Sequence, residues 1–215
     1  MTDRPGTELD PKAIVRDGYD RASHAYRADD VPLEGSSHEH WLRRLTRRLA
    51  PGARVLDLGC GNGVPVARAL ADTYRVTGVD LSPVNIARAR ALVPGATFLC
   101  DDMTRAPFTS GSFDAIAAFW SIINVPLDEQ PALFERLHDW LVPGGWLLAI
   151  VGRDPWTGIE QDWRGVSGVG MYYSHADVAT YRRWLAASGF TIVEDGVEPR
   201  HGRPGYAVLL AERGV

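Results

Sequence analysis

The chain has 215 residues, of which 45% are hydrophobic and 23% are charged, and this globular composition excludes wholesale disorder. Its 23 basic and 27 acidic residues give a net charge of −4, which argues against general affinity for nucleic acid or an anionic membrane. The polar N-terminus indicates no secretory signal, and no apolar run approaches the ~18 residues that would suggest a spanning helix. The sequence predicts a cytoplasmic protein with a single domain over residues 1–215.

Two helices are predicted before the core, and together they form an N-terminal helical cover over residues 1–50. In the first, from Pro11 to about Arg27, apolar residues recur near helical spacing, and Asp10 is placed to cap it. The second runs from about Glu39 to Ala50 and stops at Pro51-Gly52.

Strand and helix patterns then alternate over residues 51–151, which form the predicted cofactor-binding core. Strands are expected at Arg54–Leu58, Arg75–Val79, Ala96–Cys100, Phe113–Phe119 and Trp146–Val151, and helices at Val64–Ala71, Pro83–Ala91 and Glu129–Leu141. Pro143-Gly144-Gly145 is predicted to be a turn before the last of these strands. Such alternation predicts a parallel sheet that is covered on both faces.

The chain after residue 176 has a different pattern. Over residues 177–215 the sequence predicts a helix at Asp177–Ser188 and strands at Thr191–Glu198 and Tyr206–Glu212. The connection Pro199–Gly205 is too short for a helical crossover, so the last two strands should pair antiparallel.

The glycine-rich segment Val55–Gly63 (VLDLGCGNG) joins the first core strand to a helix, and its glycines allow a sharp turn and close approach to a ligand. The dinucleotide fingerprint G-x-G-x-x-G requires a glycine at position 64, where this chain has Val64. Asp57 would repel a pyrophosphate, whereas it favours a ligand with an ammonium and a sulfonium, such as S-adenosylmethionine.

Two further acidic positions follow the next strands. Asp80 stands 17 residues after Gly63, where a carboxylate can accept hydrogen bonds from both ribose hydroxyls. It is not needed as a helix cap, because Ser82 fills that role. Asp102 and Met103 follow the third strand, where an Asp side chain and main-chain amides can read an adenine edge; a solvated loop explains them equally well.

Five segments in this order, VLDLGCGNG, VTGVDLS, FLCDDMTRAPF, SGSFDAIAAFWSIINVP and LVPGGWLL, resemble the successive motifs of class I S-adenosylmethionine-dependent methyltransferases. The resemblance covers roughly residues 40 to 150. It implies an α/β fold with a Rossmann-like seven-stranded sheet of order 3-2-1-4-5-7-6, in which strand 7 is antiparallel. It also implies S-adenosyl-L-methionine as the cofactor.

The resemblance assigns cofactor-binding residues at each motif. In chain order these are Tyr19, Tyr26, Asp57, Gly59, Cys60, Gly61, Asp80, Leu81, Asp102, Met103, Phe119 and Trp120. Residues 57–61 would hold the methionine part, Asp80 the ribose and residues 102–103 the adenine. Tyr19 and Tyr26 belong to a stretch similar to the Y-D-x-x-A-x-x-Y element, whose helix folds over the cofactor, although such spacing also suits simple packing. Asn124 stands where related sequences often have histidine.

Residues 152–176 interrupt the strand and helix alternation after the fifth strand, and they are predicted to form a lid. Four aromatic residues in this insert are candidates to bind the acceptor: Trp156, Trp163, Tyr172 and Tyr173. The alternative is a surface hairpin whose aromatic side chains pack on the core. His175 is the candidate catalytic base; the alternative places it in a helical first turn, with Ser174–Asp177 as a capping box.

These features predict a methyltransferase that moves a methyl group from S-adenosylmethionine to a small-molecule acceptor, at oxygen or nitrogen, by in-line displacement. No metal is expected, because the histidines are scattered. A nicotinamide-dependent oxidoreductase is disfavoured by the glycine spacing and by Asp57. A non-catalytic cofactor-binding protein and a macromolecular substrate remain as alternatives, and the sequence does not indicate the oligomeric state.

Overall fold

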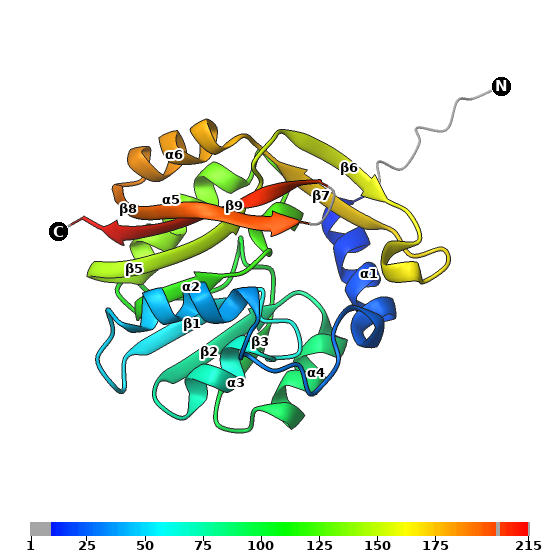
Figure 1. Ribbon diagram of the computed structural model, residues 1–215, viewed down its shortest axis with the longest axis horizontal. Coiled ribbons are helices and arrows are strands. Elements are labelled where there is room, and N and C mark those ends of the chain that lie inside the picture. The colour runs from blue at the N-terminus through cyan, green and yellow to red at the C-terminus, as the bar shows by residue number, and fades with distance from the viewer. Residues whose placement is uncertain (1–9, 201–202, 215) are drawn as a thin grey trace.

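A seven-stranded sheet forms the centre of the computed structural model, which describes residues 10–200 and 203–214 (Figure 1). Its order is β3-β2-β1-β4-β5-β9-β8. The strands of this sheet are β1 (Arg54–Leu58), β2 (Arg75–Asp80), β3 (Thr97–Cys100), β4 (Phe113–Ala118), β5 (Leu141–Val151), β8 (Phe190–Arg200) and β9 (Arg203–Arg213). Strands β1 to β5 are parallel, and β9 runs antiparallel to both β5 and β8. The predicted strand order and the antiparallel last strand are confirmed.

Helices cover both faces of this sheet. The helices are α1 (Pro11–Tyr26), α2 (Ser37–Thr46), α3 (Val66–Ala71), α4 (Pro83–Leu92), α5 (Gln130–Trp140) and α6 (Val178–Ala187), with short 3-10 helices η1 (Ile122–Asn124) and η2 (Trp163–Gly165). On one face, α5 and α6 bury Phe134 and Tyr181 against the sheet. On the other, α2, α3 and α4 bury Leu45, Leu70 and Ile86. Both faces of the parallel strands are therefore buried, as their continuous apolar runs require.

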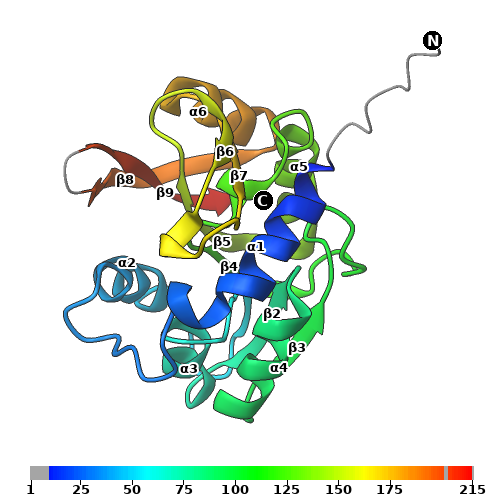
Figure 2. The same ribbon diagram turned by 90° about the vertical axis from the view of Figure 1, so that its right-hand side faces the viewer.

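The cover over the carboxyl ends of the strands has two parts. One is α1, and the other is a separate antiparallel hairpin formed by β6 (Trp156–Glu160) and β7 (Met171–His175), with η2 between its strands. Figure 2 shows α1 crossing in front of the sheet beside this hairpin. Helix α1 packs against α4 on one side and against β7 and η2 on the other. The hairpin accounts for the predicted insert.

Three local expectations are corrected by the structure. Pro143-Gly144-Gly145 is no turn before a strand, because β5 already begins at Leu141 and pairs there with Phe113. The register shifts between this pair and the next, Ala115 with Trp146, so a bulge absorbs the glycines. The loop predicted at 199–205 is shorter, because β8 and β9 continue to a pair between residues 200 and 203.

The third correction concerns the capping box at Ser174–Asp177. His175 is the last residue of β7, and α6 begins only at Val178. Asp177 is the N-cap, and its side chain accepts a hydrogen bond from the Thr180 amide at 2.6 Å. The polar segment before Asp10, from which the sequence predicts no secretory signal, lies outside the described residues.

Candidate active site

A cavity lies at the carboxyl ends of the parallel strands, beneath α1. Ligands of open α/β sheets bind at this edge. All the residues predicted to hold the cofactor line it: Tyr19, Tyr26, Asp57, Gly59, Cys60, Gly61, Asp80, Leu81, Asp102, Met103, Phe119 and Trp120. The fold thus gathers them around one space, although they come from α1 and from the ends of four strands.

The turn after β1 brings the main chain close to this cavity. Gly59 has φ of +80°, and a Cβ there would lie 2.2 Å from the Cβ of Ser121. Gly61 has φ of +56°, with no atom within 4 Å of the position that a Cβ would take. Glycine is therefore required at Gly59 by the backbone conformation and by the lack of space, and it is favoured at Gly61 by the backbone conformation alone.

Asp57 is the buried carboxylate of the turn, with only 2% of its surface exposed. Its Oδ2 has no hydrogen-bond partner among the described residues. Burial raises the pKa of Asp57 to about 7; the charge of Arg27 opposes this rise and that of Asp80 adds to it. A buried carboxylate oxygen without a partner favours a cationic ligand group, so this residue fits the ammonium of the methionine part of S-adenosylmethionine.

Asp80, at the end of β2, is held in a fixed orientation. Its Oδ2 accepts from the Gly61 amide at 2.9 Å, and its Oδ1 accepts from the Ser82 amide at 2.9 Å and from Asn85 Nδ2 at 3.3 Å. Burial raises the pKa of this carboxyl as well. The carboxylate is thereby fixed beside the glycine turn, where it suits the ribose hydroxyls.

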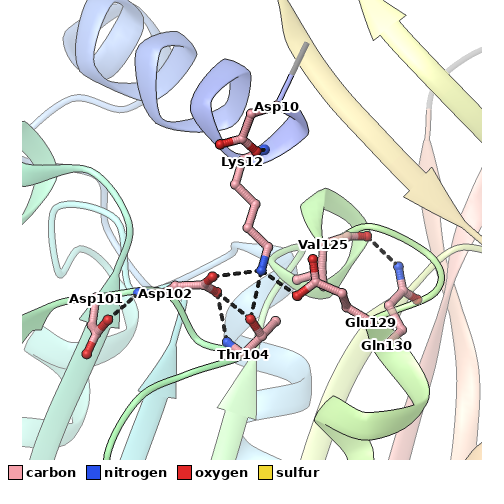
Figure 3. A network of polar contacts seen from close by, with 8 residues as sticks. All are labelled: Asp10, Lys12, Asp101, Asp102, Thr104, Val125, Glu129 and Gln130. Atoms are coloured by element: carbon pink, nitrogen blue, oxygen red, sulfur yellow. Dashed lines mark hydrogen bonds and ion pairs between the residues drawn. The ribbon is translucent and has the colours of Figure 1, made fainter. Parts of the chain in front are cut away.

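Lys12, which was not predicted from the sequence, lines the same cavity. Its ammonium Nζ contacts Asp102 Oδ2 at 2.7 Å, Thr104 Oγ1 at 2.8 Å and Glu129 Oε2 at 2.5 Å (Figure 3). One signal was available, because Lys12 is the only lysine among 23 basic residues. Its partners are 90 or more positions away, so no local pattern could reveal them.

A second cavity adjoins the first, and four residues line both: Tyr19, Tyr26, Arg27 and Trp120. The ring of Trp163 lies 5.1 Å from that of Tyr19 and 5.2 Å from that of Tyr26, between centroids. We call the four residues that line both cavities, Tyr19, Tyr26, Arg27 and Trp120, the shared wall. Arg27 donates to the Val64 carbonyl at 2.8 Å and to the Tyr26 hydroxyl at 3.0 Å, which fixes its guanidinium there.

The four candidate acceptor residues divide into two pairs. Trp163 and Tyr173 line the second cavity, and Trp163 Nε1 donates to the Tyr173 hydroxyl at 2.8 Å. Trp156 and Tyr172 line neither cavity, and 46% of the Trp156 surface is exposed. The main chain of Tyr172 nevertheless holds the Asn124 side chain, because the Tyr172 carbonyl accepts a hydrogen bond from Asn124 Nδ2 at 2.7 Å.

Among the other candidates, His175 lies beside Trp156, outside both cavities. It ends β7 beside Trp156, with ring centroids 6.2 Å apart, and packs so closely on Gly152 that a Cβ there would lie 2.2 Å from its Nδ1. It lines neither cavity. Asn124, which the sequence analysis noted only as a departure from histidine, lines the first cavity and accepts from the Tyr19 hydroxyl at 3.3 Å.

Over residues 10–200 and 203–214, no helix has the length and apolarity needed to cross a membrane. In the same part of the chain, no cluster of three or more His, Cys, Asp and Glu side chains is arranged to hold a metal ion.

Comparisons with known proteins agree on one family. Residues 55–145 match the family model described as a methyltransferase domain. Demethylmenaquinone methyltransferase of Clavibacter sepedonicus is 32% identical over 225 residues, which cover 92% of this chain and 88% of that protein. Its counterpart in Beutenbergia cavernae is 34% identical over 66% of this chain, which spans only 60% of that relative's length.

A solved structure shares the fold over the whole chain. The 1,6-didemethyltoxoflavin-N1-methyltransferase of Burkholderia thailandensis, with 1,6-didemethyltoxoflavin and S-adenosylhomocysteine bound, has a TM-score of 0.73 and 22% identity. The alignment covers 100% of this chain and 94% of that one. The site geometry, the family model and the Clavibacter relative agree that the chain belongs to the class I S-adenosylmethionine-dependent methyltransferases.

Proposed function

We propose that this protein transfers a methyl group from S-adenosylmethionine to a small-molecule acceptor bound in the second cavity, at oxygen or nitrogen. The observation that carries the proposal is the shared wall, since Tyr19, Tyr26, Arg27 and Trp120 line both cavities. A group in either cavity contacts the same four side chains, so the acceptor atom and the methyl group can approach each other there. Holding two reactants in line can remove about 7–11 kcal/mol of the barrier to such a transfer.

The cofactor end of the proposal assigns one role to each carboxylate. Asp57 holds the ammonium, Asp80 the ribose hydroxyls and Asp102 the adenine. When bound, S-adenosylmethionine supplies a methyl group that its sulfonium already activates, so the chain's own residues need only bind, align and exclude water. Helix α1 and the β6–β7 hairpin suit the last task, because they cover the carboxyl ends of the strands.

The shared wall offers the acceptor a hydrogen-bond donor in Arg27, whose guanidinium only donates and has N–H groups beyond those bonded to Val64 and Tyr26. Burial raises the pKa of Tyr19 well above its ordinary value, so its phenol stays neutral at pH 7, and its hydrogen is donated to Asn124 Oδ1. Neither residue acts as a base at pH 7. Direct displacement without a metal or a base is therefore the mechanism we propose, with an acceptor whose reacting atom carries a lone pair at neutral pH.

The second cavity favours a flat acceptor. Six aromatic residues line it: Tyr19, Tyr26, Trp120, Trp163, Tyr173 and Tyr206. Aromatic walls suit planar rings by stacking and edge contacts. The relatives' name, demethylmenaquinone methyltransferase, refers to such a ring, which supports a ring compound as the acceptor here. The net charge of −4 makes a nucleic acid substrate the weaker alternative.

A transfer assay tests this function. The protein is incubated with S-adenosylmethionine carrying a tritiated methyl group and with a panel of phenols, hydroquinones and ring amines. We expect labelled product from at least one ring compound, and loss of that product in Trp163→Ala while S-adenosylhomocysteine still binds. Binding of S-adenosylhomocysteine without transfer to any small acceptor would favour a non-catalytic binding protein or a macromolecular substrate.

A further inference from the structure

Lys12 is unusual in this chain because every other lysine or arginine position is an arginine. The sequence has 22 arginines and one lysine, and that lysine lies in the first turn of α1, facing the cofactor cavity. Only 18% of its side chain is exposed. An ammonium and a guanidinium are not interchangeable where the acceptors surround one point.

The acceptors around Lys12 match an ammonium. Its Nζ has three donor hydrogens and three partners: Asp102 Oδ2 at 2.7 Å, Thr104 Oγ1 at 2.8 Å and Glu129 Oε2 at 2.5 Å (Figure 3). All three ammonium hydrogens are therefore donated to protein atoms, and none is left for a ligand. Its effect on the cavity must therefore pass through its partners.

Asp102 is the partner that the three contacts fix most completely. Its Oδ1 accepts from the amide and the hydroxyl of Thr104, both at 2.9 Å, and its Oδ2 accepts from Lys12. A carboxylate has about four acceptor positions, so the one position left open is on Oδ2. Burial works against ionisation, but the hydrogen bonds from Lys12 and Thr104 hold the pKa of Asp102 below its ordinary value.

We propose that Lys12 is a positioning residue for base recognition: by filling one acceptor position of Asp102 and fixing its orientation, it leaves a single position for the exocyclic amino group of adenine. The inference rests on the proposed function, since it requires the nucleoside to lie against Asp102. A base with a carbonyl at that place would set oxygen against a carboxylate, and the fixed Asp102 could not turn away. The clasp of Lys12, Asp102, Thr104 and Glu129 therefore selects adenosine over inosine.

Calorimetric titration with two ligands measures this selection directly. S-adenosylhomocysteine carries the amino group, and S-inosylhomocysteine carries a carbonyl in its place. We expect the wild type to prefer the adenosine compound by at least about tenfold, since an unpaired buried acceptor weakens binding by that order. In Lys12→Met the preference should fall to about threefold or less, because Asp102 Oδ2 then loses its fixed partner and only Thr104 still holds the carboxylate. Lys12→Arg should not restore it fully.

Arg21→Met is the matched control on the same helix. Arg21 donates to the Gly168 carbonyl at 2.9 Å and so ties α1 to the hairpin, and it does not line the cofactor cavity. If Lys12 only holds α1 down, both variants weaken both ligands alike and the preference stays unchanged. If Lys12 positions Asp102, only Lys12→Met changes the preference. Should Lys12→Met fail to fold, Thr104→Val carries the test, since Thr104 fixes the other oxygen.

Two results would overturn the inference: equal affinity of the wild type for both ligands, or an unchanged preference in Lys12→Met. Failure of the wild type to bind S-adenosylhomocysteine at all would instead refute the proposed function. The two failures are therefore distinguishable in the same titration.

Discussion

Replacing Asp57 with asparagine should stabilise the ligand-free protein while weakening cofactor binding. Burial raises the pKa of this carboxyl from 3.8 to about 7, a rise of about three units, and each unit corresponds to 1.36 kcal/mol. The ionised carboxylate thus destabilises the fold by up to about 4 kcal/mol. Because the folded pKa exceeds the unfolded one, this penalty is absent below pH 3.8, grows as the pH rises to about 7, and is constant above that.

Asp57→Asn removes this penalty, so its stabilising effect should be large at pH 8 and small near pH 4. Binding should change in the opposite direction. A hydrogen bond to a charged group contributes about 1.5–3 kcal/mol, so the affinity for S-adenosylhomocysteine should fall by about 10- to 100-fold. In the wild type, ligand binding should release a proton below pH 7, because the ammonium requires the ionised carboxylate.

Urea denaturation at pH 4.5 and pH 8 measures the stability, and calorimetry in two buffers of different ionisation enthalpy measures the affinity and the proton release. Asp114→Asn is the matched control on the neighbouring strand. The hydrogen bond from Arg54 lowers the pKa of Asp114, so this variant should lose stability at pH 8. An Asp57→Asn protein that is less stable at pH 8 and binds S-adenosylhomocysteine as tightly as the wild type would refute the reasoning.

Three other substitutions distinguish the role of the glycine turn in stability and cofactor binding from the role of the second cavity in acceptor binding. Gly59→Ala should destabilise the fold by about 3 kcal/mol in urea denaturation, because its Cβ would lie 2.2 Å from Ser121 Cβ. Gly61→Ala, with open space at the same test position, should lose only about 1 kcal/mol of stability, while calorimetry shows a larger loss of S-adenosylhomocysteine affinity. Trp163→Phe removes the donor to the Tyr173 hydroxyl, so the acceptor KM should rise severalfold with S-adenosylhomocysteine affinity unchanged; equal changes in both would contradict separate cavities.

Local patterns predicted a parallel sheet with an antiparallel last pair and the acidic and glycine residues of the first cavity, whereas the strand order and the other lining residues were implied by the family resemblance. Asp57, Gly59, Gly61 and Asp80 each lie within three residues of a strand end, and parallel strands bring those ends to one edge. The antiparallel pairing at the C-terminus followed from a connection too short for a crossover. Such features depend on neighbours in the chain.

The features that the sequence did not predict depend on distant partners. The clasp joins Lys12 to Glu129 across 117 positions, and nothing near either residue indicates the other. His175 was chosen for its chemistry, but the ladder of β6 and β7 directs it to Gly152 and Trp156. The Pro143–Gly145 segment has turn composition, yet a bulge keeps it within β5; tertiary pairing overrides local propensity there.

One titration most directly tests the central claim. The claim is that the cavity beneath α1 binds S-adenosylmethionine with the ammonium of its methionine part at Asp57. S-adenosylhomocysteine and NAD are each titrated into the protein by calorimetry at pH 8. The account predicts one molar equivalent of S-adenosylhomocysteine bound and no measurable binding of NAD. Binding of NAD, or of neither compound, would contradict it.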